Sequence, residues 1–233
     1  MRAQVVDEEV QIVLVGDFNP SIFNPQWFAL KKLMTEAEAE QAKTEICHQE
    51  VSKFTADWYQ IEVFQSRFVA RTKHMGRIEE LRDFVAQTFE ILAETPLSAL
   101  GINTQIEYRC PSTRSWHALG DTLAPKGIWK GVLPSTDVGM KFLEIRSMRE
   151  DGLPGAHNIS VYPVLPPQSS SRTNVVFKVN AHIELRQAIE AKQTESLYSV
   201  LMEYFEPEIK FASAISNWVL DQVDENGNVN NDA

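Results

Sequence analysis

The chain has 233 residues, of which 43% are hydrophobic, enough for a full core in one large domain or in two small fused halves. Its 22 Lys and Arg against 32 Asp and Glu give a net charge of -10, which argues against a nucleic-acid partner that needs a basic face. Two widely separated cysteines, and a short N-terminal apolar run preceded by acidic residues, predict a cytoplasmic protein without a membrane partner.

The N-terminal part is expected to form one strand and two short helices. The strand covers residues 10–18, a β-branched run that ends before Pro20. A short helix is expected at residues 26–33. A second helix begins at Thr35, where Glu38 completes a capping box.

The next part is expected to form strands and then a long helix. Apolar and polar residues alternate over residues 47–74, which predicts two strands. A helix is predicted at residues 78–94, and Pro96 ends it. Its apolar side chains recur with a helical period and form one stripe: Ile78, Leu81, Phe84, Val85, Phe89 and Leu92.

After residue 96 a similar order of elements begins again. The expected elements are a strand at 99–110, a helix capped by Ser112 or Thr113, and strands at 140–150, 157–165 and 174–185. Residues 166–171 are expected to form a flexible hairpin loop. Residues 188–220 are predicted to be almost wholly helical, with a kink or a new helix start at Pro207.

This order predicts an α+β fold, with a largely antiparallel sheet and long amphipathic helices on one face. The repetition predicts two α+β halves, residues 1–96 and 97–222, packed on the same sheet. Residues 223–233 are expected to be a disordered tail. A doubly wound sheet is disfavoured, because single strands do not alternate with helices through Gly-rich turns.

The stretch Gly16-Asp17-Phe18-Asn19 is the sharpest chemical signal in the sequence. Metal-dependent phosphodiesterases carry such a stretch at a catalytic strand, together with a glutamate on an earlier strand and a terminal Asp-His pair. Only 15 residues precede Gly16 here, and no Asp-His or His-Asp dipeptide occurs. We therefore interpret the stretch as a strand end, in which Gly16 permits a bulge, Asp17 and Asn19 cap turns, and Phe18 packs.

Other candidate catalytic groups are also given structural interpretations. His117 and Asp121 have the spacing of two metal ligands on a helix, but no third ligand accompanies them, so a surface pair is expected. Cys47 and His48 are neighbours that point to opposite faces of a strand, so a buried free cysteine is expected at residue 47. Cys110 is expected to end a strand. No nucleotide-binding or hydrolase motif occurs, and neither a catalytic residue nor a cofactor is predicted.

Aromatic residues are the predicted binding residues. Trp27, Trp58, Trp116 and Trp129 lie near expected element ends, where a large ring either seals the core edge or lines a partner groove. Sealing of the core is favoured, and Trp27, Trp116, Trp129 and Phe142 are the candidates for a binding surface. In a small-molecule binder, Phe142, Trp116 and Trp129 would line an apolar pocket between the two halves.

Five stretches carry a resemblance: VLVGDFNPSIFNPQWF, LSALGINTQIEYR, FLEIRS, VFKVNAHIEL and LYSVLMEYFEPEI. Their order resembles a group of sporadically distributed bacterial proteins of unknown function, which share a strand entering Phe-Asn-Pro and a mid-chain Gly-Ile-Asn strand. The resemblance extends from about Val10 to Leu220 and implies an α+β fold with two similar halves. Its motifs are apolar and structural, so it implies no catalytic residue.

These observations lead to two function classes besides the small-molecule binder. The first is a non-enzymatic protein-binding or regulatory protein, an accessory or neutralising component of a bacterial defence or toxin module, which binds another protein and self-associates through its long C-terminal helix. The alternative is a metal-dependent phosphodiesterase-like hydrolase that uses Asp17 and Asn19, with Glu144 or His182 as further ligands of Mg²⁺ or Mn²⁺.

Overall fold

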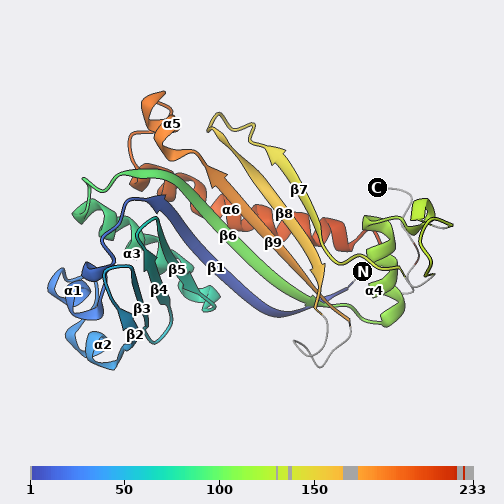
Figure 1. Cartoon of the computed structure of the whole chain (residues 1–233), viewed down its shortest axis with the longest axis horizontal. Helices are drawn as coiled ribbons and strands as arrows, with labels where there is room; N and C mark the ends of the chain where they lie inside the picture. Colours follow the sequence, from blue (N-terminus) through green and yellow to red (C-terminus); the bar gives the residue numbers. More distant parts are fainter. Residues whose placement is uncertain (1, 130, 136–137, 165–172, 225–227, 229–233) are drawn as a thin grey trace.

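The computed structural model describes residues 2–129, 131–135, 138–164, 173–224 and 228. These residues form one nine-stranded antiparallel sheet in the order β2-β3-β4-β5-β1-β6-β9-β8-β7 (Figure 1). The strands are β1 (Gln4–Gly16), β2 (Lys43–Cys47), β3 (Val51–Thr55), β4 (Gln60–Phe64), β5 (Arg67–Thr72), β6 (Leu97–Arg109), β7 (Leu143–Met148), β8 (Gly155–Pro163) and β9 (Asn174–Ile183). The predicted α+β class with an antiparallel sheet is confirmed.

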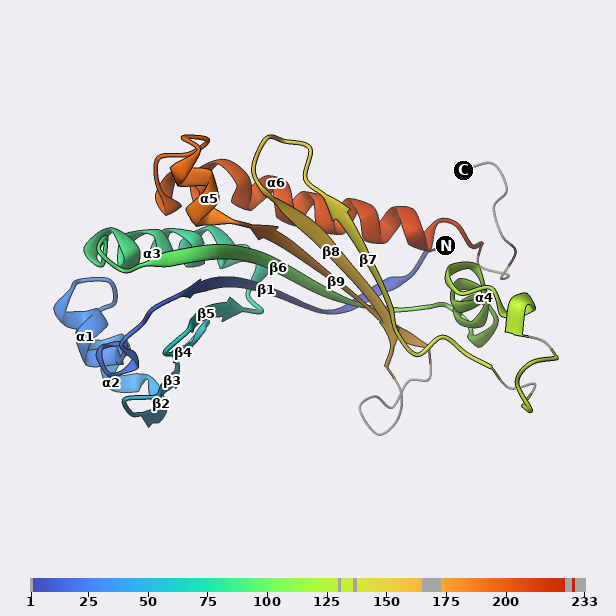
Figure 2. The same cartoon turned by 45° about the horizontal axis from the view of Figure 1, so that its top comes forward.

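Six α-helices and three short 3-10 turns accompany the sheet in the described residues. The helices are α1 (Pro25–Leu30), α2 (Glu36–Gln41), α3 (Ile78–Ile91), α4 (Thr113–Leu123), α5 (Leu185–Glu190) and α6 (Leu197–Leu220). The 3-10 turns are η1 (Pro20–Ile22), η2 (Met75–Arg77) and η3 (Lys126–Trp129). The long helices α3 and α6 lie on the same side of the sheet (Figure 2). None of the described helices has the length and hydropathy of a membrane span.

The two central strands join the halves of the chain. β1 and β6 have 13 residues each and pair antiparallel, with Ile12 opposite Ile102. In both halves a long strand is followed by one or two helices, a meander of strands and a covering helix, and the last strand of each meander pairs with the first strand. The sheet is therefore continuous across the boundary between the halves.

The apolar stripe of α6 faces the chain's own sheet. Leu201, Phe205 and Ile209 are buried in the core that also holds residues of α3, and Ala212 and Leu220 belong to a second core beneath β6, β8 and β9. The sequence analysis expected the long C-terminal helix to mediate self-association, but the apolar stripe of this helix packs within the chain. The larger exposed apolar residues on α6 are Tyr198, Phe211 and Trp218.

Two of the predicted secondary-structure segments are wrong. Residues 43–72 form four strands and not two, because the β4–β5 turn at Gln65 and Ser66 and the neighbouring turns lack the Gly or Pro that marks a hairpin. The helix expected over residues 188–220 is divided into α5 and α6, and α6 continues through Pro207 instead of starting there.

Two further expectations fall on segments that are described only in part. The predicted hairpin loop at residues 166–171 lies outside the described residues. Most of the predicted tail also lies outside them, but Val223 is buried in the second core. The ordered fold therefore extends at least one residue beyond α6 and its C-cap region.

Candidate functional site

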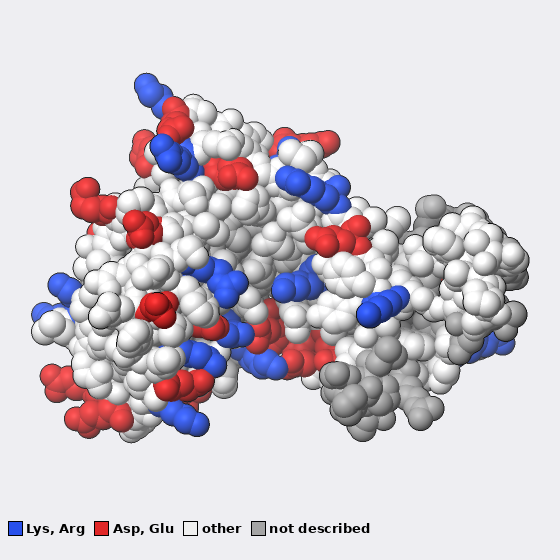
Figure 3. All heavy atoms as spheres, viewed as in Figure 1, with Lys and Arg blue, Asp and Glu red and all other residues white. Residues whose placement is uncertain are grey.

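One face of the sheet is not covered by any of the described helices (Figure 2). We call the face turned away from α3 and α6 the open face. The sheet bends so that this face is concave (Figure 2). Figure 3 views the molecule from this side and shows a hollow near its middle, bordered by acidic and basic side chains. A sheet face without a covering layer is normally solvated and polar, so the arrangement of its polar groups determines what it can bind.

A row of directly paired polar residues crosses the open face, one residue from each strand. We call it the polar row, and its members are Lys43, Thr55, Gln60, Arg71, Gln11, Asn103, Asn180, Asn158 and Arg146. Residues that are directly opposite on neighbouring strands have Cβ atoms about 5 Å apart, so their side chains interact. The register of eight strand pairs therefore assembles a line of hydrogen-bonding groups from most of the chain.

Three asparagines in the polar row are connected by hydrogen bonds. Asn158 Nδ2 donates to Asn180 Oδ1 over 3.0 Å, and Asn180 Nδ2 donates to Asn103 Oδ1. Gly101 leaves room for this amide ladder, because a Cβ there would lie 3.0 Å from Asn180 Nδ2. Within the described residues, the ladder leaves the carbonyl oxygen of Asn158 and the amide nitrogen of Asn103 available to a ligand.

The other part of the polar row is held by charged and polar contacts. Arg71 pairs with Glu62 through Nη2 over 2.7 Å, and its Nε is buried without a hydrogen-bond partner. Gln60 Nε2 donates to Thr55 Oγ1 over 3.0 Å and to Glu45 Oε1 over 3.3 Å. The side chains on both sides of β1 are therefore held in place before any ligand binds.

A hollow of about 600 Å³ lies over the amide ladder on the open face. Phe142 and Tyr162 form one wall, with their rings stacked at 5.9 Å and 23°. Lys141, Glu144 and Lys178 supply charges of both signs to the lining. The predicted binding residue Phe142 thus lies at this hollow, next to three amides that the sequence analysis did not single out.

Trp27 lies on α1, in the other half of the chain from Phe142. Its ring packs against the first core, 5.0 Å from Phe28 and 5.9 Å from Phe23. It seals the core edge at α1, which is the role that the sequence analysis favoured for its tryptophans. The four predicted aromatic residues therefore do not form one surface.

Trp116 and its neighbours line a separate pocket of about 460 Å³ beside α4. The Trp116 indole Nε1 donates to the carbonyl oxygen of Asn174 over 3.1 Å. His117 and Asp121 both lie on α4, as predicted, and Asp121 pairs with Lys126 over 2.8 Å. Trp129 is half exposed in the nearby turn η3.

The structural interpretation of Gly16 to Asn19 fits the geometry. The pairing of β1 with β6 shifts register between Val15 and Gly16, and a Cβ at Gly16 would lie 2.4 Å from the carbonyl oxygen of Pro96. Asn19 Oδ1 accepts from the Ser21 amide over 3.3 Å, and Phe18 is buried. Asp17 is exposed at the strand end, and its backbone amide donates to Pro96.

The further ligands proposed for a hydrolase do not lie near Asp17. Glu144 belongs to the cross-strand row that passes through Glu9 of β1, which is eight residues, or about 26 Å, from Asp17 along the strand. His182 belongs to the row through Val13 and contacts Glu184 over 3.0 Å. In the described part of the chain, no three His, Cys, Asp or Glu side chains are grouped to hold a metal ion.

The two cysteines lie in different environments. Cys47 is exposed on the edge strand β2, so the expectation that it is buried is wrong. An edge strand has only one strand neighbour, and the alternation of apolar and polar residues does not show whether a strand lies at the edge of a sheet. Cys110 is buried directly after β6, and burial raises the pKa of its thiol to about 11. Cys110 is therefore a protonated thiol at neutral pH.

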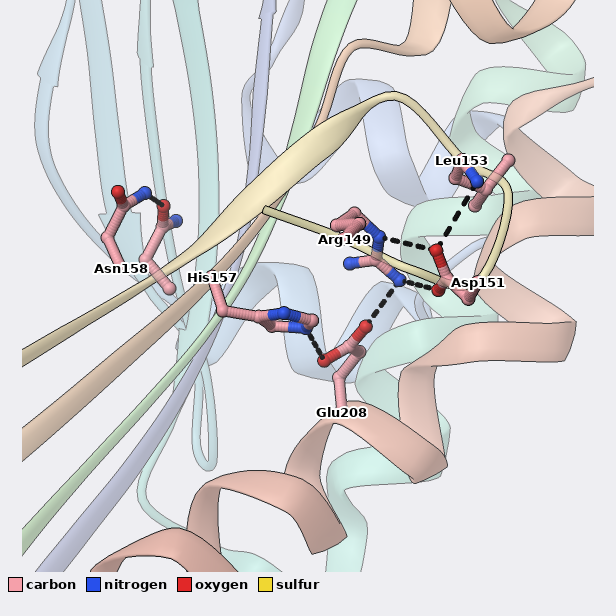
Figure 4. A network of polar contacts seen from close by, with 7 residues as sticks. Arg149, Asp151, Leu153, His157, Asn158 and Glu208 are labelled. Carbon is pink, nitrogen blue, oxygen red and sulfur yellow. Dashed lines mark hydrogen bonds and ion pairs between the residues drawn. The ribbon is translucent and has the colours of Figure 1, made fainter. Parts of the chain in front are cut away.

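A buried ionic cluster, which the sequence analysis missed, joins α6 to the β7–β8 hairpin (Figure 4). Glu208 of α6 accepts from Arg149 over 2.7 Å and lies 2.9 Å from His157 Nε2. Arg149 also pairs with Asp151, whose carboxylate accepts from the Leu153 amide. Burial acts to raise the pKa of Asp151, but the hydrogen bonds and charge of Arg149 outweigh it, and the pKa lies below its ordinary value.

No protein-family model matches the chain, and no curated protein matches it. Among solved structures, the chain is similar to the di-domain ARO/CYC StfQ from the steffimycin biosynthetic pathway, with 10% identity, 90% of this chain and 96% of that chain covered, and a TM-score of 0.25. The di-domain ARO/CYC BexL from the BE-7585A biosynthetic pathway also has 10% identity and a TM-score of 0.25, with 95% and 97% covered. Similarity at this level carries no argument about the function of this chain.

Proposed function

We propose that this chain is a non-enzymatic binding protein that receives another protein on its open face, along the polar row. The observation that carries the proposal is the register of the sheet, which aligns one polar residue from each of nine strands on the face that none of the described helices covers. Neighbouring strands lie about 4.8 Å apart, so the row extends for roughly 38 Å. A line of this length is larger than a small molecule and comparable to one side of a protein–protein interface.

The chemistry of the row favours a protein partner with exposed hydrogen-bonding groups. The amide ladder presents both a donor and an acceptor, and such groups complement backbone amides and Asn or Gln side chains. Because the asparagine side chains already bond to one another, little rotamer entropy is lost when a partner binds. Mixed charge on the same face gives specificity through matched opposite charges.

The resemblance to sporadically distributed bacterial proteins supports a narrower form of the proposal. In that form the partner is a protein of a bacterial defence or toxin module, and this chain has an accessory or neutralising role. Neutralisation would follow from steric cover of the partner by the concave face and needs no catalytic group on this chain.

The amide ladder provides the test of the proposed function. The double variant Asn158→Ala/Asn180→Ala removes two central amides, and we expect the affinity for the partner to fall by about tenfold or more. The measurement is affinity capture from the native host by the wild-type chain, followed by titration of the captured protein against each variant. Leu30→Ala, at an exposed position of α1, is the matched control and should bind as the wild type does.

Two results would contradict the proposal. One is that the double variant, shown by circular dichroism to be folded, binds the captured protein as tightly as the wild type does. The other is that the Leu30→Ala variant loses the partner to the same extent, which would place the interface on the helical side of the molecule.

The pocket beside α4 favours a second candidate function, the binding of a small apolar molecule. Its volume of about 460 Å³ lies in the usual range for ligand pockets, and Trp116, Leu119 and Met140 supply apolar lining. The dye anilinonaphthalene sulfonate is a suitable probe. We expect saturable quenching of tryptophan fluorescence that Trp116→Phe abolishes and that Trp218→Phe, at an exposed position on α6, retains. Equal quenching in both variants would retire this candidate.

A further inference from the structure

Strand β7 is an edge of the sheet, and no described element lies outside it (Figure 1). Its residues pair with β8 without a register shift, from Leu143 opposite Val161 to Met148 opposite Ala156. The other edge strand, β2, contains a shift between Thr44 and Ile46. Natural edge strands are normally protected by bulges, prolines or a covering element, and β7 has no such protection within the described residues.

The β7 edge also exposes large apolar side chains. Phe142, Ile145 and Met148 have exposed fractions of 54%, 52% and 63%. They occur within seven consecutive residues, Phe142-Leu-Glu-Ile-Arg-Ser-Met148. Exposed apolar residues gathered along an unpaired edge are typical of an interaction surface.

The backbone of β7 is oriented so that an added strand can bond to it. The Arg149 amide donates to the carbonyl oxygen of Gly155 on the neighbouring strand over 3.3 Å. Backbone groups alternate in direction along an antiparallel strand, so those of Leu143, Ile145 and Ser147 also point to β8. The amides and carbonyls of Glu144 and Arg146 therefore point to the free side.

We propose that two copies of this chain associate by antiparallel pairing of their β7 strands about a two-fold axis at Ile145. In this register, Glu144 of each copy lies opposite Arg146 of the other copy. Ile145 lies opposite Ile145, and Phe142 lies opposite Met148 of the second copy. The three exposed apolar residues are thereby all covered by one symmetric contact.

Charge complementarity determines the register. Glu144 and Arg146 lie on the open face, opposite Ser160 and Asn158 of the same chain, and no ion pair is found for either within the described residues. Shifting the two-fold axis by one residue either way would place Glu144 against Glu144 or Arg146 against Arg146. The register centred on Ile145 instead forms two opposite-charge pairs and brings the Met148 sulfur to the Phe142 ring.

Contacts on the side of β7 that faces α6 are also consistent with the register centred on Ile145. Phe211 of α6 packs 4.7 Å from the ring of His157, which pairs with Ser147. Because Leu143 of the second copy would lie opposite Ser147, it would reach toward this ring. A two-fold axis perpendicular to the sheet places both open faces on the same side of the dimer. If the open face binds a partner as proposed, the dimer binds with two sites and gains avidity; the dimer itself does not depend on that function.

Charge reversal on β7 tests the dimer. Light scattering of the wild-type chain should give twice the chain mass of 26.4 kDa at high protein concentration. Glu144→Arg and Arg146→Glu each replace two attractive pairs with two repulsive ones. The dimer dissociation constant of each variant alone should therefore rise by about tenfold or more. An equal mixture of the two variants should recover the dimer, because each then faces opposite charges. The double variant Glu144→Arg/Arg146→Glu should recover it as well.

Ile46→Arg, on the opposite edge strand, is the control and should leave the mass unchanged. All of these positions are exposed, and circular dichroism verifies that each variant is folded. A wild-type chain that remains monomeric at every concentration would overturn the proposal. A dimer that survives both single reversals, or that the mixture fails to restore, would overturn the register. Loss of partner capture with an intact dimer would count only against the proposed function.

Discussion

Glu208→Ala is expected to lower the free energy of unfolding by about 3 kcal/mol, because it removes the central carboxylate of the buried ionic cluster. The Glu208 side chain has an exposed fraction of 7%, and the Arg149 side chain that it pairs with has 0%. Arg149 Nη1 is already buried without a partner, and the variant would leave the buried guanidinium with the more exposed Asp151 as its remaining acidic partner. Urea unfolding followed by circular dichroism measures the change.

Glu206→Ala is the matched control, because Glu206 lies on the same helix and pairs with Lys210 over 2.6 Å at the surface. An exposed pair of this kind contributes little to stability, because solvent screens the charges and two long side chains lose entropy when they pair. The combined variant Arg149→Met/Glu208→Leu should recover most of the lost stability, since it removes both charges instead of one. Equal effects of Glu208→Ala and Glu206→Ala would contradict the inference that burial determines the effect.

Local patterns in the sequence predicted the elements that depend on neighbouring residues. The capping box of Thr35 and Glu38 forms at the start of α2, and Ser112 caps α4. The bulge at Gly16 forms where the stretch Gly-Asp-Phe-Asn ends β1. Each of these features is determined within a few residues, which explains why single-sequence reasoning finds it.

The candidate sites depend instead on residues far apart in the chain. Alternation alone identifies Gln11 and Asn180 as polar residues on a strand, but only the register shows that both belong to one row. The buried ionic cluster joins Arg149 and His157 of the β7–β8 hairpin to Glu208 on a helix about fifty residues later. Strand register and helix docking are set by tertiary packing, so neither site was predicted.

The edge position of β7 is also determined by tertiary packing. Its sequence, with Glu144, Ile145 and Arg146 in alternation, predicts a strand, and the prediction is confirmed. Whether a strand lies inside a sheet or at its edge depends on the order of all nine strands. The exposure of Ile145 is therefore visible only in the structure, although its self-complementary neighbours are readable in the sequence.

Phe23→Ala is expected to lower the free energy of unfolding by about 3–5 kcal/mol, because Phe23 is the centre of an aromatic cluster. Its exposed fraction is 1%, and five rings have centroids within 6.4 Å of its own: Phe18, Trp27, Phe28, Phe68 and Phe89. The buried Ser52 hydroxyl also donates to the Phe23 carbonyl oxygen over 2.6 Å. Thermal and urea unfolding measure the loss.

Leu30→Ala serves as the control for this variant, since Leu30 belongs to the same segment but is exposed, and its change should stay within about 0.5 kcal/mol. Comparison of the two variants shows whether the stretch from Gly16 to Phe28 contributes to the packing of the core. If Phe23 anchors the core as its ring contacts indicate, the stretch contributes packing, and backbone geometry positions Asp17 and Asn19. A Phe23→Ala variant as stable as Leu30→Ala would show that the segment contributes little to the core, and a functional role for its polar residues would then have to be sought.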